Sequence, residues 1–202
     1  MDAFERLELP HLPWLDPTAI KEQFKKLSAS HHPDRFHAAP EEDQRREQSI
    51  YMAMNEAARQ LSDPSTRLRL LLEHHGHQKT GVVEQAPGHL MDWFMEFGQL
   101  ARKIRQHQGE QEKAASPILK AQLMAATLEL TEELNQFRGR LQEQLDQVFA
   151  RLRELTPDWP VDSAPTPTQL DQLSDIHRTV AHLDRWHNQV KELLVNLSFQ
   201  TP

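Results

Sequence analysis

Three consecutive residues, His32, Pro33 and Asp34, carry side chains suited to chemistry or to recognition. With His31 beside them, an imidazole and a carboxylate supply the parts of an acid–base pair. The sequence offers no nucleophile elbow, glycine-rich phosphate loop or set of oxyanion donors to accompany that pair. An enzyme is therefore disfavoured, and the display of His32 and Asp34 to a partner protein is the favoured interpretation.

A helix that begins near Asp16 is expected to carry this tripeptide at its end. Asp16 is a preferred N-cap residue, and Pro17 suits the first helical position because its missing N–H costs nothing there. Steps of four, three and four then predict one stripe that faces a core, formed by Ile20, Phe24, Leu27 and His31. Because Pro33 disfavours the helical conformation at His32, we expect the helix to end there and a turn to follow.

The face of this helix away from the stripe is cationic. Lys21 and Lys25 lie one turn apart, well around the helix from the stripe, and Lys26 lies on the far side as well. Glu22 is the only carboxylate within the predicted helix and cannot offset three lysines. We expect an acidic docking partner, while an ordinary solvated lysine face remains the open alternative.

A second amphipathic helix is predicted after Pro40, where three acidic residues suit the positive end of a helix dipole. Its apolar stripe consists of Ile50, Met54, Ala57 and Leu61. Two antiparallel helices joined by a His-Pro-Asp loop, the first of them basic, resemble a J-domain. The segments that carry this resemblance are 20–27, 31–35 and 54–64.

Segments 1–10 and 67–76 resemble, more narrowly, the HscB family of J-proteins of iron-sulfur cluster assembly. In that family the basic helix and the His-Pro-Asp loop dock on a chaperone of the DnaK or HscA class and stimulate its ATP hydrolysis. The resemblance implies these chaperone-binding residues: Lys21, Lys25, Lys26, His32, Pro33, Asp34 and Arg35. The catalytic residues then belong to the chaperone, so neither a catalytic residue nor a cofactor is expected here.

The second half of the chain reads as three further helices. Apolar residues recur at steps of three and four over 119–155 and again over 170–197, after a proline-rich connection. A shorter helix within 88–113 has its stripe at Leu90, Phe94, Phe97, Ala101 and Ile104. The predicted fold is therefore all-α, with an N-terminal J-domain helical hairpin and a C-terminal three-helix bundle.

Domain bounds follow from composition. Between Gly76 and Gly88 the chain lacks a helical period, which divides it into a J-domain at 1–76, a linker at 77–87 and a client-binding bundle at 88–202.

Helix starts are marked four times by a capping residue and a proline: Asp16-Pro17, Asp63-Pro64, Ser116-Pro117 and Thr166-Pro167.

The first bundle helix is the candidate client site. HscB proteins capture an iron-sulfur scaffold of the IscU type chiefly through this helix, and the resemblance implies contacts from Leu90, Met91 and Phe94. Independently, Met91 and Met95 are one turn apart on a face other than the Leu90 stripe, and Trp93 adds apolar area. Adaptable methionine and aromatic side chains are typical of partner sites. The predicted client-binding residues are Leu90, Met91, Phe94 and Met95.

The chain also departs from the HscB pattern. Positions where the family offers acidic or aromatic side chains to the scaffold are Met95, Gly98, Arg102 and His182. Two alternatives therefore stay open. In one, the bundle binds a different client or mediates self-association; in the other, the J-like hairpin is vestigial and only the bundle binds.

Composition excludes several other classes. A formal charge of −7 over 202 residues disfavours nucleic-acid binding, and the lack of cysteine excludes thiolate-ligated zinc or iron-sulfur sites. No apolar run approaches the roughly 18 residues of a membrane span, and an acidic N-terminus fits no signal or transit peptide, so a cytoplasmic location is expected. His74, His75 and His77 lack a second spaced ligand pair, so no metal site is expected.

Overall fold

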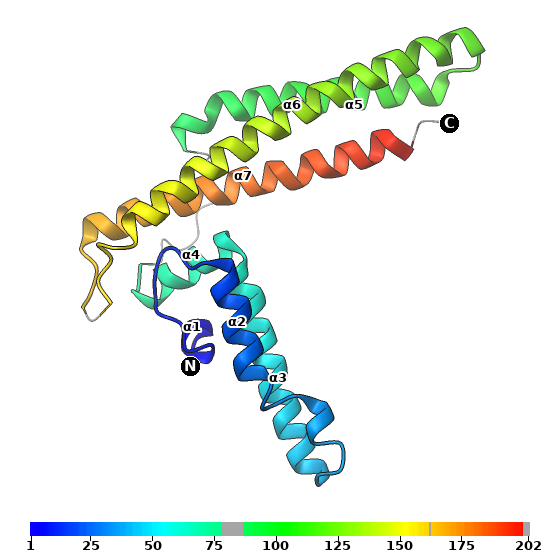
Figure 1. The fold of residues 1–202 in the computed structure, drawn as a ribbon. Helices are drawn as coiled ribbons and strands as arrows, with labels where there is room; N and C mark the ends of the chain where they lie inside the picture. Colours follow the sequence, from blue (N-terminus) through cyan, green and yellow to red (C-terminus); the bar gives the residue numbers. More distant parts are fainter. Residues whose placement is uncertain (78–86, 162, 200–202) are drawn as a thin grey trace. The chain divides into compact units, whose positions relative to one another are not determined.

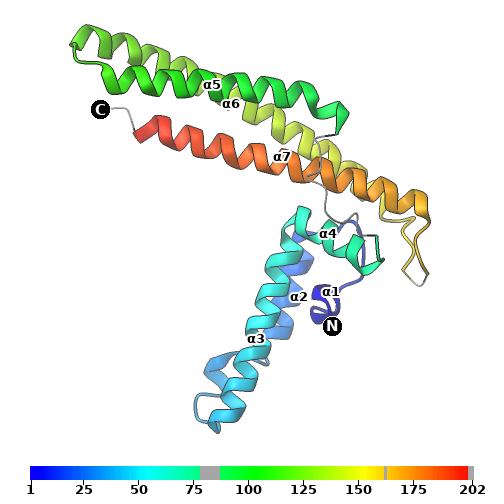
Figure 2. The ribbon, with the colours of Figure 1, turned by 180° about the vertical axis from the view of Figure 1, so that it is seen from behind.

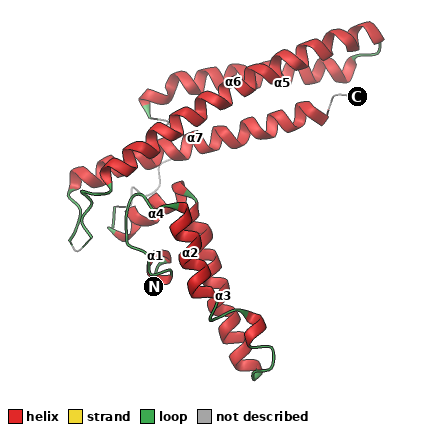
Figure 3. Cartoon of the chain, viewed as in Figure 1, coloured by secondary structure: helices red, strands yellow, loops and turns green. Residues whose placement is uncertain are grey.

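The computed structural model describes residues 1–77, 87–161 and 163–199, and every regular element among them is helical (Figure 3). The elements are α1 (Ala3–Arg6), α2 (Pro17–Ser28), the 3₁₀ turn η1 (Pro33–Arg35), α3 (Glu41–Ser62), α4 (Pro64–His74), the 3₁₀ turn η2 (Gly88–Leu90), α5 (Met91–Lys113), α6 (Pro117–Leu155) and α7 (Pro167–Phe199). The predicted all-α class is confirmed. The predicted linker at 77–87 lies, except for its first and last residues, outside the described residues.

Four helices begin at the prolines marked in the sequence. Asp16 and Asp63 each accept a backbone N–H of the first helical turn at 2.7 Å. The hydroxyl groups of Ser116 and Thr166 do the same for α6 and α7. These side chains satisfy donors that have no partner within the helix, which explains why the starts were predictable.

Contacts between Cα atoms divide the chain into two compact units. The first comprises Met1–Val82 with Phe149–His177, and the second comprises Val83–Val148 with Arg178–Pro202. Both α6 and α7 therefore contribute residues to each unit. This division groups residues 149–177 with the N-terminal elements, whereas the sequence analysis placed them in the C-terminal bundle. The assignment of a J-domain, a linker and a client-binding bundle stays a prediction.

The first unit is organised around α3. The helices α1, α2 and α4 each pack against it, and α2 and α3 lie side by side in both views (Figures 1 and 2). Its core contains Phe4, Leu7, Ile20, Leu61, Leu68 and Leu71. Arg67 is also buried, and its Nη1 donates to the carbonyl of Leu61 at 2.7 Å. Burial lowers the pKa of the Arg67 guanidinium to about 10, so it stays charged at neutral pH.

In the second unit α5 and α6 pack against each other along most of α5. Trp93 and Phe137 pair near one end, with ring centroids 5.6 Å apart, and His107 Nε2 lies 2.8 Å from Thr127 Oγ1 near the other. Since residue numbers rise along α5 and fall along α6 between these contacts, the two helices are antiparallel. The core of the unit, to which α7 also contributes, includes Leu100, Ile104, Leu130, Leu134, Leu141, Leu183 and Val190.

The predicted stripe of α5 is wrong at Phe94, whose side chain is 54% exposed. The buried positions are instead Leu100, Ile104 and His107, at steps of four and three. Phe94 is six residues before Leu100, which places it well around the helix from that line. Its apolar character therefore belongs to the surface of the unit. No helix within the described ranges is long and apolar enough to cross a membrane.

Candidate functional site

The loop between α2 and α3 is a short, hydrogen-bonded turn. His32 has an extended backbone and its Nδ1 accepts the N–H of Asp34 at 3.3 Å. Arg35 N–H donates to the carbonyl of His32 at 3.0 Å, and Phe36 N–H donates to that of Pro33 at 3.0 Å. The tripeptide thus caps and opens η1, which fixes the direction of its side chains.

The helix before the loop ends earlier than predicted. We expected it to reach His32, but α2 ends at Ser28 and a turn follows, closed by a hydrogen bond from His31 N–H to the carbonyl of Ser28. The hydroxyl of Ser30 donates to the carbonyl of Leu27 at 2.8 Å, so a side chain replaces the next helical bond. His31 nevertheless turns its ring toward α3, as expected for a stripe position.

Two residues of α3 support the loop from one side. His31 Nδ1 lies 2.6 Å from Oε2 of the buried Glu47, and the ring of His32 meets that of Tyr51 edge-on at 5.4 Å. The hydrogen bond with His31, aided by Arg46, holds the pKa of Glu47 below its usual value in spite of burial. Glu47 is therefore an ionised anchor beneath the loop.

Both chemically distinctive side chains of the tripeptide face solvent. The side chain of His32 is 46% exposed and that of Asp34 is 87% exposed. His32 Nδ1 and Asp34 Oδ2 are 3.5 Å apart, too far for a strong hydrogen bond. Arg35 is exposed beside them, and its Nη1 donates to the carbonyl of Ala29 at 3.2 Å. The arrangement suits contact with another protein better than proton transfer.

The lysine face of α2 is where the sequence predicted it. Lys21, Lys25 and Lys26 are all exposed. Within the ranges described, no carboxylate, Glu22 included, lies within ion-pairing distance of any of them. The lysine face, as we call these three residues, therefore offers its full charge to solvent beside the loop.

A second candidate site is a groove between α5 and α7 in the second unit. Its volume is about 600 Å³. Most of its lining is apolar, and the lining includes Met91, Phe94, Phe97, Gly98, Arg105, His182, Arg185 and Trp186. We call this feature the α5–α7 groove.

The predicted client residues differ in how much surface they offer. Met91 and Phe94 line the groove and are 51% and 54% exposed; Met95 lies outside its lining and is 56% exposed. Leu90 is only 2% exposed, so it lies beneath this surface and offers almost no area of its own. Trp93 packs against Phe137 and is half-buried, so it does not belong to the exposed apolar set.

The rim of the groove is cationic. Arg105 and Arg185 are exposed, and among the described residues neither has a carboxylate within ion-pairing distance. Both belong to the lining, one from each helix. An apolar floor with an unpaired arginine on each side favours a ligand surface that is apolar at its centre and acidic at its edge.

The structure brings to His74 two side chains that the sequence analysis did not connect with it. Its Nδ1 lies 3.1 Å from Asp2 Oδ2, and His11 Nε2 lies 2.8 Å from the same oxygen. The partners come from the N-terminal segment, more than sixty residues away, so no local spacing pattern could reveal them.

The chain is similar to known proteins in both sequence and fold. No family model matches the sequence. The chain is 31% identical over 147 residues to the co-chaperone protein HscB homolog of Bordetella pertussis, a match that covers 70% of this chain and 83% of that protein. It is 33% identical over 94 residues to the homolog of Vibrio atlanticus, covering 46% and 55%. The solved structure of chaperone HscB from Vibrio cholerae matches with a TM-score of 0.61 and 21% identity over 98% of this chain and 99% of that one, which supports the fold.

Proposed function

The chain belongs to the HscB family of co-chaperones, and from this premise we propose that it stimulates ATP hydrolysis by a DnaK/HscA-type chaperone and delivers an iron-sulfur scaffold client to it. The observation that carries the proposal is the loop itself, in which His32 and Asp34 are exposed on a braced turn beside the unpaired lysine face. The resemblance of the loop to a J-domain supports the choice of partner.

The loop and the lysine face have different roles in this proposal. Lys21, Lys25 and Lys26 draw an acidic surface of the chaperone toward the site, and this attraction weakens as salt screens it. His32, Pro33, Asp34 and Arg35 then make the short-range contacts that promote hydrolysis. The chain performs no reaction of its own, because ATP is bound and cleaved by the chaperone.

The client occupies the α5–α7 groove. Met91 and Phe94 provide the apolar contact area, Met95 extends it, and Leu90 is buried next to Met91 in the sequence. For an IscU-type scaffold, the matching surface would present an apolar side chain to the groove and carboxylates to Arg105 and Arg185.

A different client is the second candidate. The observation in its favour is the cationic rim, together with Met95, Gly98 and Arg102 at positions where HscB proteins tend to offer acidic side chains. A scaffold surface that is complementary to acidic side chains would then face arginine side chains on this chain. Binding of purified IscU-type scaffold to the full chain, measured by calorimetry, separates the two: binding that Phe94→Ala weakens supports the scaffold, and no binding transfers the groove to another client.

The chaperone half of the proposal is tested by single-turnover ATP hydrolysis. A DnaK/HscA-type chaperone loaded with ATP is mixed with the wild-type chain or with His32→Gln. We expect faster hydrolysis with the wild type and none of that gain with the variant. Equal hydrolysis with both proteins, or no gain with either, would refute the proposal and favour an adaptor that binds through its bundle alone.

A further inference from the structure

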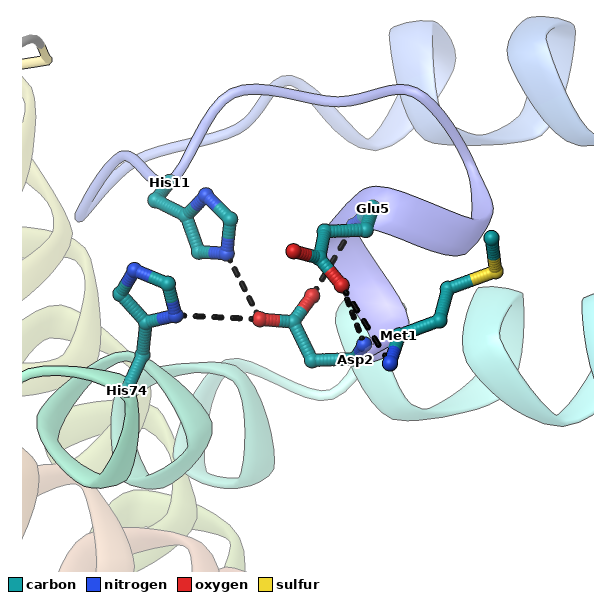
Figure 4. Close-up of polar contacts among 5 residues, drawn as sticks. All are labelled: Met1, Asp2, Glu5, His11 and His74. Carbon is teal, nitrogen blue, oxygen red and sulfur yellow. Dashed lines mark hydrogen bonds and ion pairs between the residues drawn. The ribbon is translucent and has the colours of Figure 1, made fainter.

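Three potential metal ligands from separate segments meet in the first unit. Asp2 is the N-cap of α1, His11 lies between α1 and α2, and His74 is the last residue of α4 (Figure 4). In the close-up both imidazole rings turn a nitrogen toward the same carboxylate oxygen of Asp2. None of the three belongs to the loop, the lysine face or the groove described above.

The distances are those of a compact donor set. Asp2 Oδ2 lies 2.8 Å from His11 Nε2 and 3.1 Å from His74 Nδ1. One ligand atom from each residue lies within 4.8 Å of the other two. A tetrahedral ion with ligand bonds of 2.0–2.1 Å needs its ligand atoms about 3.3 Å apart, so each of the two carboxylate–imidazole distances would have to lengthen by about half an ångström or less.

Other contacts hold the three ligands in place. Asp2 Oδ1 accepts the N–H of Glu5 at 2.9 Å, and a Glu5 oxygen accepts the N–H of Asp2 at 2.8 Å, which leaves Oδ2 directed at the histidines. The rings of His11 and His74 are stacked, with centroids 3.8 Å apart. The ring centroid of Phe4, a core residue, lies 4.7 Å from that of His11. Such second contacts orient ligands and strengthen metal sites.

The charge state of the cluster also suits a cation. Burial acts to raise the pKa of Asp2, but the backbone hydrogen bond from Glu5 and the contact with His11 outweigh it and lower that pKa. The carboxylate is therefore ionised at neutral pH. It faces two imidazoles that can each offer a lone pair, because a neutral histidine has one unprotonated nitrogen.

We propose that Asp2, His11 and His74 bind a divalent first-row transition-metal ion, with Zn²⁺ as its representative. Two imidazoles and one carboxylate match the ligand preferences of such ions, whereas Ca²⁺ and Mg²⁺ prefer oxygen ligands alone. His74 is 38% exposed, which leaves room for a water or a further side chain at the fourth position. The bound ion joins the N-terminal segment to the end of α4.

The consequence is a stapled first unit. The metal would fix residues 2–11 against the last turn of α4, so binding should stabilise the folded chain without altering the loop. At a Zn²⁺ concentration a hundredfold above Kd, mass action raises the thermal midpoint by about 5–10 °C. Stimulation of a chaperone is not expected to change, so this proposal stands or falls independently of the proposed function.

The test uses the full chain prepared without a histidine tag. Zn²⁺ binding is measured by calorimetry, and Co²⁺ is added separately because its visible absorption reports tetrahedral coordination. The variants are Asp2→Asn, His11→Gln and His74→Gln, and the control is His187→Gln, which removes a half-buried histidine in the second unit. Circular dichroism checks that each variant is folded.

We expect one equivalent of Zn²⁺ to bind the wild type and the His187→Gln control, and the affinity to fall at least about a hundredfold in each of the three cluster variants. Asp2→Asn keeps a side-chain oxygen for the Glu5 N–H, so its loss of affinity would not come from a lost helix cap. Absence of stoichiometric binding in the wild type would overturn the proposal, as would binding that survives in the cluster variants.

Discussion

The His-Pro-Asp loop and the α5–α7 groove present their side chains in opposite ways. The loop offers charged and polar groups from consecutive residues, anchored on one face of α3 through Glu47 and Tyr51. The groove offers apolar area from two helices whose contributing residues are about ninety positions apart. Each site therefore depends on a different kind of interaction, and each should respond to different perturbations.

This contrast fits a chain with two unlike partners. Attraction between the lysine face and an acidic surface acts at a distance and decreases with ionic strength. Apolar contact in the groove acts only on close approach, is proportional to the buried area and is insensitive to salt. Mutations at the two sites should thus be separable in both partner and salt dependence.

The largest effect is expected at the loop. His32→Gln removes an imidazole that is exposed and has no role in the core, so the stimulation of ATP hydrolysis by the chaperone should be lost altogether, with the thermal midpoint unchanged. Single-turnover hydrolysis and a thermal melt measure the two quantities. Client affinity should stay at the wild-type value, and a loss of both activities would deny that the sites are separate.

The next effect is expected at the groove. Phe94→Ala removes an exposed aromatic anchor and should weaken client binding by about 2 kcal/mol, roughly thirtyfold, with little change in stability. Calorimetry with the purified client measures the affinity. As a control, Leu128→Ala truncates a side chain on α6 that is 65% exposed and lies outside the groove lining, and it should bind as the wild type does.

Filling the groove offers a sharper version of the same test. A Cβ added at Gly98 or at Gly139 meets no atom within 4 Å, so both helical glycines accept a larger residue. Gly98→Phe should obstruct the groove and reduce client affinity by at least tenfold, whereas Gly139→Phe on α6 should not. Equal effects of the two variants, measured in the same calorimetric assay, would move the client away from the groove.

A smaller effect is expected at the lysine face. Replacing Lys21, Lys25 and Lys26 together by glutamine should weaken chaperone association by about tenfold at low salt, because exposed charges contribute about 0.5 kcal/mol each. The difference should shrink as salt rises toward 0.5 M, about where screening leaves little attraction. Association kinetics at several ionic strengths measure it. A salt-independent deficit would mean that the lysines act through packing instead of charge.

The smallest effect concerns Glu47 and pH. Because its folded pKa lies below the usual value of 4.5, Glu47 contributes stability above that pH and loses it as pH falls through the folded pKa. Glu47→Gln should therefore be less stable than the wild type at pH 7, and the gap should narrow on acidification toward pH 4. Thermal melts at both pH values test this, with Glu22→Gln as an exposed control. If the difference in stability between the wild type and Glu47→Gln does not change with pH, the substitution acts through packing and not through the charge of Glu47.

Much of the fold followed from local signals. The four capping residues before proline and the spacing of three and four residues in α6 and α7 gave helix starts that the structure confirms. The predicted face of α6 is buried at Leu123, Leu130 and Leu134 but is wrong at Leu119, which is 41% exposed. The short helix α1 was missed although Asp2 and Glu5 form a capping box, because four residues carry no periodic pattern. The end of α2 was placed too late, since side-chain hydrogen bonds in the turn compete with the helix.

The two candidate sites also differ in how far the sequence could predict them. The exposed loop and lysine face were predictable because their residues are neighbours along the chain or on one helix. The groove was only half predictable: Met91 and Phe94 signalled surplus apolar area, but the opposite wall from Arg185 and Trp186 depends on how α7 packs. Glu47 and Tyr51 were missed for a similar reason, as was the meeting of His11 with His74.

The central claim, that one chain couples a client to a chaperone through two separate sites, is tested most directly by single-turnover ATP hydrolysis with and without the IscU-type client. The wild type should stimulate hydrolysis alone and more strongly with client. Phe94→Ala should keep the first gain and lose the second, and His32→Gln should lose both. Stimulation that is the same with and without client, in a chain that binds the client, would contradict the account.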